Sequence, residues 1–303
     1  MYDVAIIGGG VAGLSAAMYS GRLRLKTILL TELRGGALAT AGEIRNWPGV
    51  LRIDGAELAK QLEAHAREYN IEIKDTVVTT IKKSKGGFEI ETPSAKYESR
   101  SIILATGTSV RKLGIPGEEE FANKGVHYCA LCDGYFYTDK TIAVVGGSDS
   151  AAKEALILTQ WANKVYIIYR KEKLRAEPVT MEQLEKNRKI TVIPNTNIVE
   201  IKGDEKGVKA VILDKPYNGS KEFPVDAVFV EIGRVAASGL AKALGVKLNE
   251  SGEVMVDREG KTNVDGVFAA GDVTDTKFKQ AILAAASGVA AAFCAYDYLK
   301  KLS

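Results

Sequence analysis

The sequence predicts an α/β fold made of two domains that share one plan, with the second inserted into the first. The order strand, glycine-rich turn, helix, strand occurs twice, starting near residues 3 and 141. Each copy then continues through a meander of short strands to a buried strand that ends at a glycine. These observations predict two three-layer domains, each with a mostly parallel sheet and a β-meander.

The first copy opens with an alternating apolar strand that runs into a glycine-rich turn and a helix reaching about residue 21. A second strand completes a βαβ unit, and a helix over residues 56–69 follows. The strands predicted for this copy lie at residues 3–7, 27–31, 77–81, 88–91, 96–97 and 102–105.

The second copy follows the same order. Its predicted strands lie at residues 141–145, 165–169, 198–202, 208–213 and 227–232. The last part of the chain returns to the first domain and contains an alanine-rich helix over residues 281–296. The expected domains are therefore residues 1–113 with 240–303, and residues 114–239, with crossovers near residues 115–117 and 238–239.

The first glycine-rich turn has the spacing of a dinucleotide-binding turn. Gly8, Gly10 and Gly13 permit a tight turn and close approach of a pyrophosphate to a helix N-terminus. Glu32 ends the next strand, where a carboxylate can accept hydrogen bonds from a ribose that has a free 2′-hydroxyl. The pattern is typical of a Rossmann-like domain that binds FAD or NAD.

The second turn departs from this pattern, because Ser148 stands where the close-approach glycine is expected and Ala151 takes the third position. Asp149 and Ser150 are equally well explained as caps of the helix. The strand end carries cations instead of an acid, which favours the 2′-phosphate of NADPH over NADH, although a solvated basic strand end gives the same pattern. These cations are Arg170, Lys171 and Arg175.

Cys129 and Cys132 form a Cys-x-x-Cys pair just upstream of the second turn. A redox role needs two thiols that can close a small disulfide and an acid that manages the proton, and Asp133 is placed to be that acid. Asp133 is also a suitable turn residue before Gly134. A structural zinc site needs four ligands, and beyond His127 the chain offers only remote candidates, so we expect no metal and a structural role for His127.

Composition limits the other functions. The 41 basic and 38 acidic residues are interspersed and leave a net charge of +3, so no nucleic-acid groove or membrane anchor is expected. Three cysteines are too few for a disulfide scaffold. The chain shows no signal-peptide pattern, and its longest uncharged stretch is shorter than a bilayer span, so a cytoplasmic location is expected.

Together these motifs resemble the low-molecular-weight thioredoxin reductases over essentially the whole chain. The matching segments are residues 8–13, 35–36, 46–49, 105–107, 115–118, 129–134, 170, 175–176, 266–272 and 280–281. The resemblance implies a homodimeric, FAD-dependent enzyme in which hydride passes from NADPH to FAD and electrons then reach a Cys129–Cys132 disulfide. Cys132 would lie next to the flavin, and Cys129 would attack the disulfide of thioredoxin or of a glutaredoxin-like protein, with Asp133 as acid and base.

The resemblance also implies the residues that bind each cofactor. Those expected for FAD are Gly8, Gly10, Ala12, Gly13, Thr31, Glu32, Gly35, Gly36, Ala37, Thr40, Asn46, Val78, Ala105, Thr106, Gly107, Gly271, Asp272, Lys279, Gln280 and Ala281. Those expected for NADPH are Gly146, Gly147, Ser148, Ser150, Ala151, Arg170, Lys171 and Arg175.

The chain departs from the family pattern at Ala37, Arg45, Ser148 and residues 169–171, where the family has glutamine, glutamate, glycine and His-Arg-Arg. The changes in the inserted domain leave open a reductase that takes electrons from reduced deazaflavin, ferredoxin or NADH. A more distant alternative is an electron transferase like the ferredoxin-NADP reductases, which lack the dithiol. Arg170 and Arg175 favour NADPH.

Overall fold

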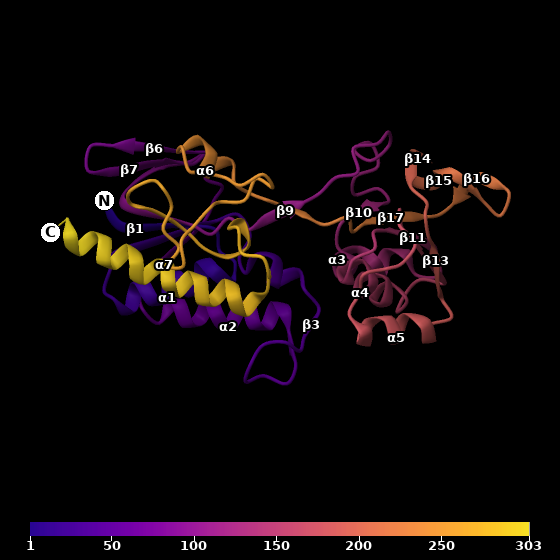
Figure 1. Ribbon diagram of the computed structural model, residues 1–303, viewed down its shortest axis with the longest axis horizontal. Coiled ribbons are helices and arrows are strands. Elements are labelled where there is room, and N and C mark those ends of the chain that lie inside the picture. Colours follow the sequence, from indigo (N-terminus) through magenta and orange to yellow (C-terminus); the bar gives the residue numbers. More distant parts are fainter. Residues whose placement is uncertain (303) are drawn as a thin grey trace. The chain divides into compact units, whose positions relative to one another are not determined.

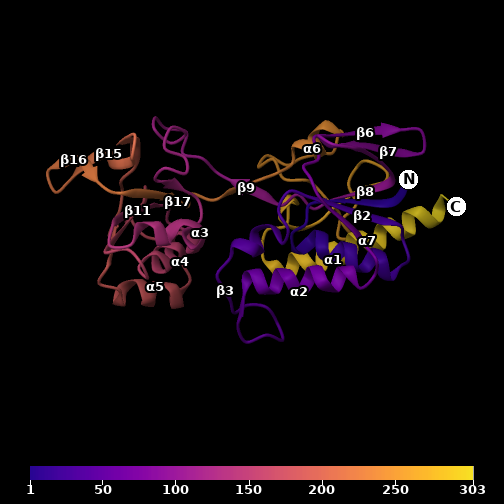
Figure 2. The ribbon, with the colours of Figure 1, turned by 180° about the vertical axis from the view of Figure 1, so that it is seen from behind.

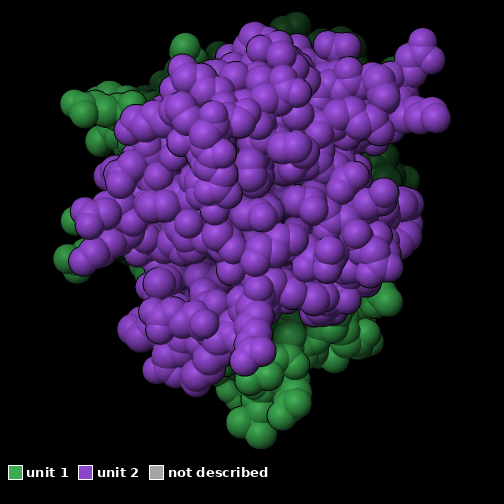
Figure 3. All heavy atoms as spheres, turned by 90° about the vertical axis from the view of Figure 1, so that its right-hand side faces the viewer, with its two compact units in different colours: residues 1–109, 235–303 green, residues 110–234 purple. Residues whose placement is uncertain are grey.

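The computed structural model describes residues 1–302, which form two compact units (Figure 3). Unit 1 comprises Met1–Ser109 and the chain from Val235 onward, and unit 2 comprises Val110–Arg234. The chain passes between the units in two short strands, β9 (Thr108–Val110) and β18 (Arg234–Ala236), which pair with each other. Each unit is described separately below.

Unit 1 is built on one sheet in the order β5-β2-β1-β8-β7-β6, with β19 also paired to β8. The β5, β2, β1, β8 and β19 pairings are parallel, and those of β8 with β7 and of β7 with β6 are antiparallel. The strands are β1 (Tyr2–Ile7), β2 (Thr27–Thr31), β5 (Glu72–Asp75), β6 (Thr80–Ser84), β7 (Gly87–Glu91), β8 (Lys96–Leu104) and β19 (Val267–Ala269).

Helices cover one face of this sheet, as Figure 1 and the reverse view in Figure 2 show. They are α1 (Val11–Arg22), α2 (Gly55–Arg67) and α7 (Ala281–Lys301). Ile6 and Ile103 of the sheet are fully buried against alanines of α1 and α7. Neighbouring strand residues such as Ile7 and Ile102 face the other side, where β6, β7 and α6 (Gly239–Ala243) pack. Both faces of the sheet are therefore buried, which explains its continuous apolar strands.

Four short elements complete unit 1. They are η1 (Gly36–Thr40), β3 (Glu43–Ile44), β4 (Ile53–Asp54) and η3 (Gly271–Val273).

The structure corrects the prediction of separate strands at residues 96–97 and 102–105. These segments belong to one strand, β8, whose first half pairs antiparallel with β7 and whose second half pairs with β19. Polar residues in the first half interrupt the apolar pattern, because that half belongs to the partly solvated hairpin while the second lies in the buried centre. The strand predicted at residues 77–81 begins later, at Thr80.

Unit 2 repeats this architecture with a parallel sheet in the order β10-β17-β11-β12-β13. Helices α3, α4 and α5 pack on one face and the β14-β15-β16 meander on the other. The strands are β10 (Val126–His127), β11 (Thr141–Val145), β12 (Lys164–Ile168), β13 (Ile190–Ile193), β14 (Ile198–Asp204), β15 (Gly207–Tyr217), β16 (Ser220–Pro224) and β17 (Ala227–Val230). The helices are α3 (Ala130–Asp133), η2 (Gly134–Tyr137), α4 (Asp149–Leu158) and α5 (Pro178–Lys186).

The alanine-rich segment forms the predicted helix, α7, which is longer than expected and ends at Lys301. By length and composition α7 could span a bilayer, with a mean hydropathy of 1.5 over its most apolar window. Its small residues instead let it lie very close to α1, since a Cβ at Gly288 would come within 2.1 Å of the Ala12 carbonyl oxygen. Such contacts are typical of a core helix.

Candidate functional site

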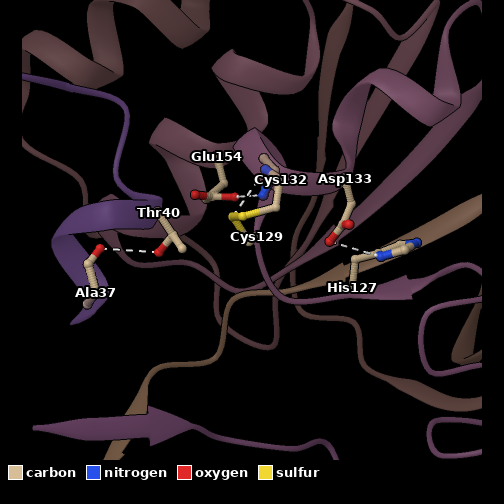
Figure 4. The surroundings of a disulfide bond; sticks show 8 residues. Ala37, Thr40, His127, Cys129, Cys132, Asp133 and Glu154 are labelled. Atoms are coloured by element: carbon tan, nitrogen blue, oxygen red, sulfur yellow. Dashed lines mark hydrogen bonds and ion pairs between the residues drawn. A yellow bond between two sulfur atoms is a disulfide. The ribbon is translucent and has the colours of Figure 1, made fainter. Parts of the chain in front are cut away.

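The Cys-x-x-Cys pair forms a disulfide at the start of α3 (Figure 4). Cys129 is the N-cap of this one-turn helix and Cys132 is its third residue, so the two Cα atoms are 5.4 Å apart. The Cys132 amide donates to Cys129 Sγ at 3.2 Å. An amide that points at a sulfur at a helix N-terminus stabilises the thiolate that forms when the disulfide is reduced. This geometry favours Cys129 as the nucleophile.

Asp133 directly follows the disulfide and lies beside His127 (Figure 4). Its Oδ2 is 3.1 Å from His127 Nδ1, and His127 Nε2 is 2.7 Å from the Tyr137 hydroxyl. A carboxyl group held near a thiol pair can deliver and remove the proton that thiol–disulfide chemistry requires.

On the opposite side of the disulfide in Figure 4, Glu154 of α4 accepts a hydrogen bond from the Ala130 amide. The carboxylate thus binds an N–H group that would otherwise lack a helical partner at the N-terminus of α3. Burial raises the pKa of Glu154 above its usual range. The side chain links α4 to the loop that holds the two sulfurs.

The first glycine-rich turn lies between β1 and α1. Gly8 has a φ of +112°, and a Cβ at Gly13 would come within 1.8 Å of the Gly8 carbonyl oxygen, so both positions require glycine. Gly10 is the N-cap of α1 and supplies no side-chain cap. Gly36 lies so close to Gly10 that a Cβ added at Gly36 would be 2.9 Å from Gly10 Cα. The two glycine segments form a backbone cradle with open helix N–H groups.

Other predicted residues of unit 1 gather at this cradle. Gly271 has a φ of +76°, and its amide donates to Ser287 of α7 at 2.9 Å. The Asn46 amide donates to Gln280 at 2.8 Å, directly before the first residue of α7, Ala281. Gly271, Asp272 and Gln280 line one hollow. Four segments far apart in the sequence therefore meet at one end of α1 and α7.

The remaining predicted residues of unit 1 lie in several different positions. Thr31 ends β2, and its Oγ1 accepts from the Gly9 amide at 3.0 Å, while Glu32 next to it is exposed. Lys279 is held by Glu253 at 2.7 Å and by the carbonyl oxygen of Asp272, so its charge is already paired. Val78 packs into the apolar cluster on the other side of the sheet from α1. The others are the N-cap of η1, residues within η1, or residues directly after β8; they are Gly35, Ala37, Thr40, Ala105, Thr106 and Gly107.

The second glycine-rich turn differs from the first in how its helix begins. Ser148 is the N-cap of α4, and its hydroxyl accepts from the Ala151 amide at 3.4 Å. The prediction that Asp149 and Ser150 cap this helix is therefore wrong. Asp149 instead pairs with Lys153 at 2.6 Å and accepts from the Glu177 amide at 2.9 Å.

The cations predicted from the sequence lie around this turn. Arg170 and Lys171 directly follow β12, and the Arg175 amide donates to the Gly147 carbonyl oxygen at 2.8 Å, which ties its loop to the turn. All three side chains are exposed. Within residues 1–302 none of them forms an ion pair with a carboxylate, so their charges are available to a bound anion.

Tyr169 is a feature of this turn that the sequence did not reveal. Its ring covers Gly147, where a Cβ would lie 2.4 Å from three ring atoms. The side chain is 6% exposed, and its hydroxyl has no hydrogen-bond partner within the described chain. A bound ligand can supply the hydrogen-bond partner that this buried hydroxyl lacks beside the glycine-rich turn.

Comparison with known proteins agrees with this geometry. The family profile described as pyridine nucleotide-disulphide oxidoreductase matches residues 2–288. The chain is 39% identical to the thioredoxin reductase of Treponema pallidum, over 99% of this chain and 98% of that protein. The chain belongs to the pyridine nucleotide-disulphide oxidoreductase family.

Two solved structures show which members of this oxidoreductase family the chain resembles in fold. The crystal structure of Lactococcus lactis thioredoxin reductase superposes with a TM-score of 0.93 at 38% identity, covering 99% of this chain and 100% of that one. The thioredoxin reductase of T. acidophilum gives 0.91 at 37% identity, covering 100% and 99%. The predicted fold class and the resemblance to low-molecular-weight thioredoxin reductases are confirmed.

Thioredoxin reductases of this oxidoreductase family use FAD and NADPH, and both units fit such ligands. In unit 1 the backbones of Gly36 and Gly10 lie close together with no side chains between them, and no side chain caps the N-terminus of α1. This arrangement suits a pyrophosphate. In unit 2 the unpaired cations and the Tyr169 hydroxyl suit a phosphorylated ligand. The observed turns therefore agree with the cofactors of the family.

A half-buried carboxyl group, that of Glu231 directly after β17, gives this oxidoreductase a pH-dependent stability. Burial and the nearby charge of Glu154 raise the pKa of Glu231 from 4.5 to about 8, against the opposing effect of Arg234. Between these two pH values the folded protein keeps a proton that the unfolded chain releases. The free energy of unfolding therefore falls as pH rises from about 4.5 to about 8.

We expect the Glu231→Gln variant to lose this part of the pH dependence, because glutamine resembles the neutral acid and does not titrate. It should match the wild type near pH 4 and be more stable by about 1–3 kcal/mol at pH 9. Urea unfolding at both pH values measures the difference. Parallel pH profiles of the two proteins would show that Glu231 does not titrate in this range.

Proposed function

We propose that this chain is an FAD-dependent thioredoxin-disulfide reductase that uses NADPH. The observation that carries the proposal is the Cys129–Cys132 disulfide at the start of α3, in the same unit as a dinucleotide turn surrounded by unpaired cations. In the net reaction NADPH supplies a hydride and the solvent a proton, and the acceptor disulfide becomes two thiols. The acceptor is a thioredoxin or a glutaredoxin-like protein, and the enzyme works as a cytoplasmic homodimer.

The two predicted domains have separate tasks in this proposal, and their bounds differ by a few residues from those of the compact units. The FAD domain is residues 1–113 with 240–303, where the glycine cradle holds the pyrophosphate and Glu32 the ribose. The NADPH domain is residues 114–239, where Gly147 and Ser150 face the dinucleotide and the cations after β12 hold the 2′-phosphate. Bound FAD supplies a two-electron carrier between the nicotinamide and the disulfide.

The protein's own residues carry out the sulfur chemistry. Cys132 receives the electrons, and Cys129 attacks the partner's disulfide to form a mixed disulfide, which Cys132 then resolves. The Cys132 amide stabilises the Cys129 thiolate. Asp133 gives a proton to the leaving sulfur when the S–S bond opens and takes one back when it closes.

The choice of nicotinamide donor provides the test of this function. Anaerobic mixing with NADPH should bleach the flavin absorbance much faster than mixing with NADH. In the Arg170→Ala/Arg175→Ala double variant the Michaelis constant for NADPH should rise by about 10-fold or more per arginine, since each charge-assisted bond contributes about 1.5–3 kcal/mol. The constant for NADH should hardly change.

Lys173→Ala is the matched control, because Lys173 is an exposed cation between the two arginines and has no proposed contact with phosphate. Equal effects of the double variant on both nucleotides would reject the 2′-phosphate site. A wild-type flavin that neither nicotinamide reduces would reject NADPH as the donor.

A further inference from the structure

His127 ends β10 in a buried position, and three elements of unit 2 contact its ring. Asp133 of α3 lies 3.1 Å from Nδ1, and Tyr137 of η2 lies 2.7 Å from Nε2. The ring of Phe229, from β17, stacks on the imidazole with centroids 5.3 Å apart. The side chain is 5% exposed. Packing therefore leaves the imidazole little freedom to turn away from Asp133.

The partners of the ring define its chemical state. Burial lowers the pKa of His127, although the Asp133 carboxylate opposes this effect, so the ring is neutral at pH 7 and carries one proton. Burial and the charges of Asp133 and Asp226 raise the pKa of Tyr137, which therefore keeps its hydroxyl proton. Because a carboxylate can only accept, we assign the ring proton to Nδ1, which faces Asp133. With this assignment the Tyr137 hydroxyl donates to Nε2.

The neutral His127 ring is the side chain paired with Asp133 in this structure. Within residues 1–302 neither a lysine nor an arginine forms an ion pair with this carboxylate. Asp226, the other acid near Tyr137, lies 3.8 Å from Lys140 Nζ at the surface. His127 is therefore the donor available to Asp133 from the protein interior.

The contact between His127 and Asp133 is close but not aligned. Nδ1 has no hydrogen bond of good geometry, although Asp133 Oδ2 is within 3.1 Å. Hydrogen bonds of catalytic groups are often loose before the reaction and become tighter during it.

We propose that His127 is a positioning residue that orients Asp133 and stabilises its carboxylate while a proton is exchanged with the Cys129–Cys132 couple. The inference rests on the proposed function. When electrons open the S–S bond, Asp133 first takes up a proton from the solvent; its O–H bond then breaks as an S–H bond forms on the leaving sulfur. Negative charge then appears on Asp133, next to the Nδ1–H group. Tyr137 keeps the proton on that nitrogen, and the reverse step returns the proton to Asp133.

The test compares His127→Leu, His127→Asn and Tyr137→Phe with the wild type. Leucine fills the space without a donor, whereas the asparagine amide places a donor close to the position of Nδ1. Stopped-flow absorbance measures two steps at a series of pH values. The first step is reduction of the flavin by NADPH, and the second step is reoxidation of the reduced flavin by the internal disulfide. We expect the leucine variant to slow the second step about 10- to 100-fold, part of the effect of an acid–base group.

The pH profile separates this role from simple core packing. Loss of the Nδ1–H donor should move the midpoint of the second step to higher pH in the leucine variant, and asparagine should largely restore both rate and midpoint. Flavin reduction by NADPH should be the same in all variants. A folded leucine variant with the wild-type rate and midpoint overturns the proposal. A wild-type flavin that does not reduce the disulfide overturns the proposed function itself, and this inference with it.

A second measurement needs no substitution at His127. The chain has two histidines, so the imidazole ¹⁵N signals can be assigned with a His65→Gln variant. The wild type should show the Nδ1–H tautomer for His127, and Tyr137→Phe should mix the two tautomers. An Nε2–H tautomer in the oxidised wild type would present a lone pair to Asp133 and overturn the proposal.

Discussion

Replacing Cys129 with serine should abolish reduction of thioredoxin while NADPH still reduces the flavin at the wild-type rate. The hydroxyl cannot form a mixed disulfide, and Cys132 alone cannot close the internal disulfide. The dinucleotide sites are built from other segments, so hydride transfer should continue. Two anaerobic measurements show the separation, namely stopped-flow bleaching of the flavin and steady-state reduction of a thioredoxin disulfide.

Cys294→Ala is the matched control for this experiment, because Cys294 is a buried free thiol in α7. The control should keep both activities. Turnover in the Cys129→Ser variant would show that another group attacks the partner. Loss of flavin reduction in the same variant would mean that the substitution disturbs more than the sulfur chemistry.

Asp133→Asn should slow proton-coupled opening and closing of the disulfide by about 10²–10⁴, the range expected when a general acid is lost. Asparagine has nearly the same shape and its oxygen can still accept from His127, so packing and the turn before Gly134 should be preserved. The slow step should also lose most of its pH dependence. Reoxidation of the reduced flavin by the internal disulfide, followed from pH 5 to pH 9, provides the measurement.

Asp204→Asn serves as the control, since Asp204 is an exposed aspartate at the end of β14 in the same unit. It should leave the rate unchanged. If Asp133→Asn behaves like this control, Asp133 is only a turn residue and the proton comes from elsewhere, and the role proposed for His127 fails with it.

Much of the fold could be predicted because its signals are local. Gly8 and Gly13 follow a buried strand and precede a helix, and the same order recurs from β11 to α4. The spacing of apolar residues and the type of turn residue, read over about ten positions, are enough to recognise such units. The prediction failed at β8, which was predicted as two separate strands. Its first half is polar and its second half is buried, so the sequence pattern changes within one strand.

The candidate site was predictable only in part. The Cys-x-x-Cys pair and the cations after β12 are visible because the residue types themselves carry the chemistry. The supporting residues carry no such signal. In the sequence Glu154 is an ordinary acidic residue of a helix, and only the fold places it against the Ala130 amide. Ser148 is identified as a helix cap only from its contact with the Ala151 amide.

The sequence by itself determined the family-level properties of this protein: the repeated α/β plan, the two dinucleotide turns and the redox-active cysteine pair. Only the tertiary structure decided what surrounds these groups, including the His127–Asp133 contact, the Tyr169 ring over Gly147 and the partial burial of Glu231. The physical reason is that backbone conformation follows short-range patterns. Hydrogen bonding, desolvation and charge at a site depend instead on residues that packing brings together from separate elements.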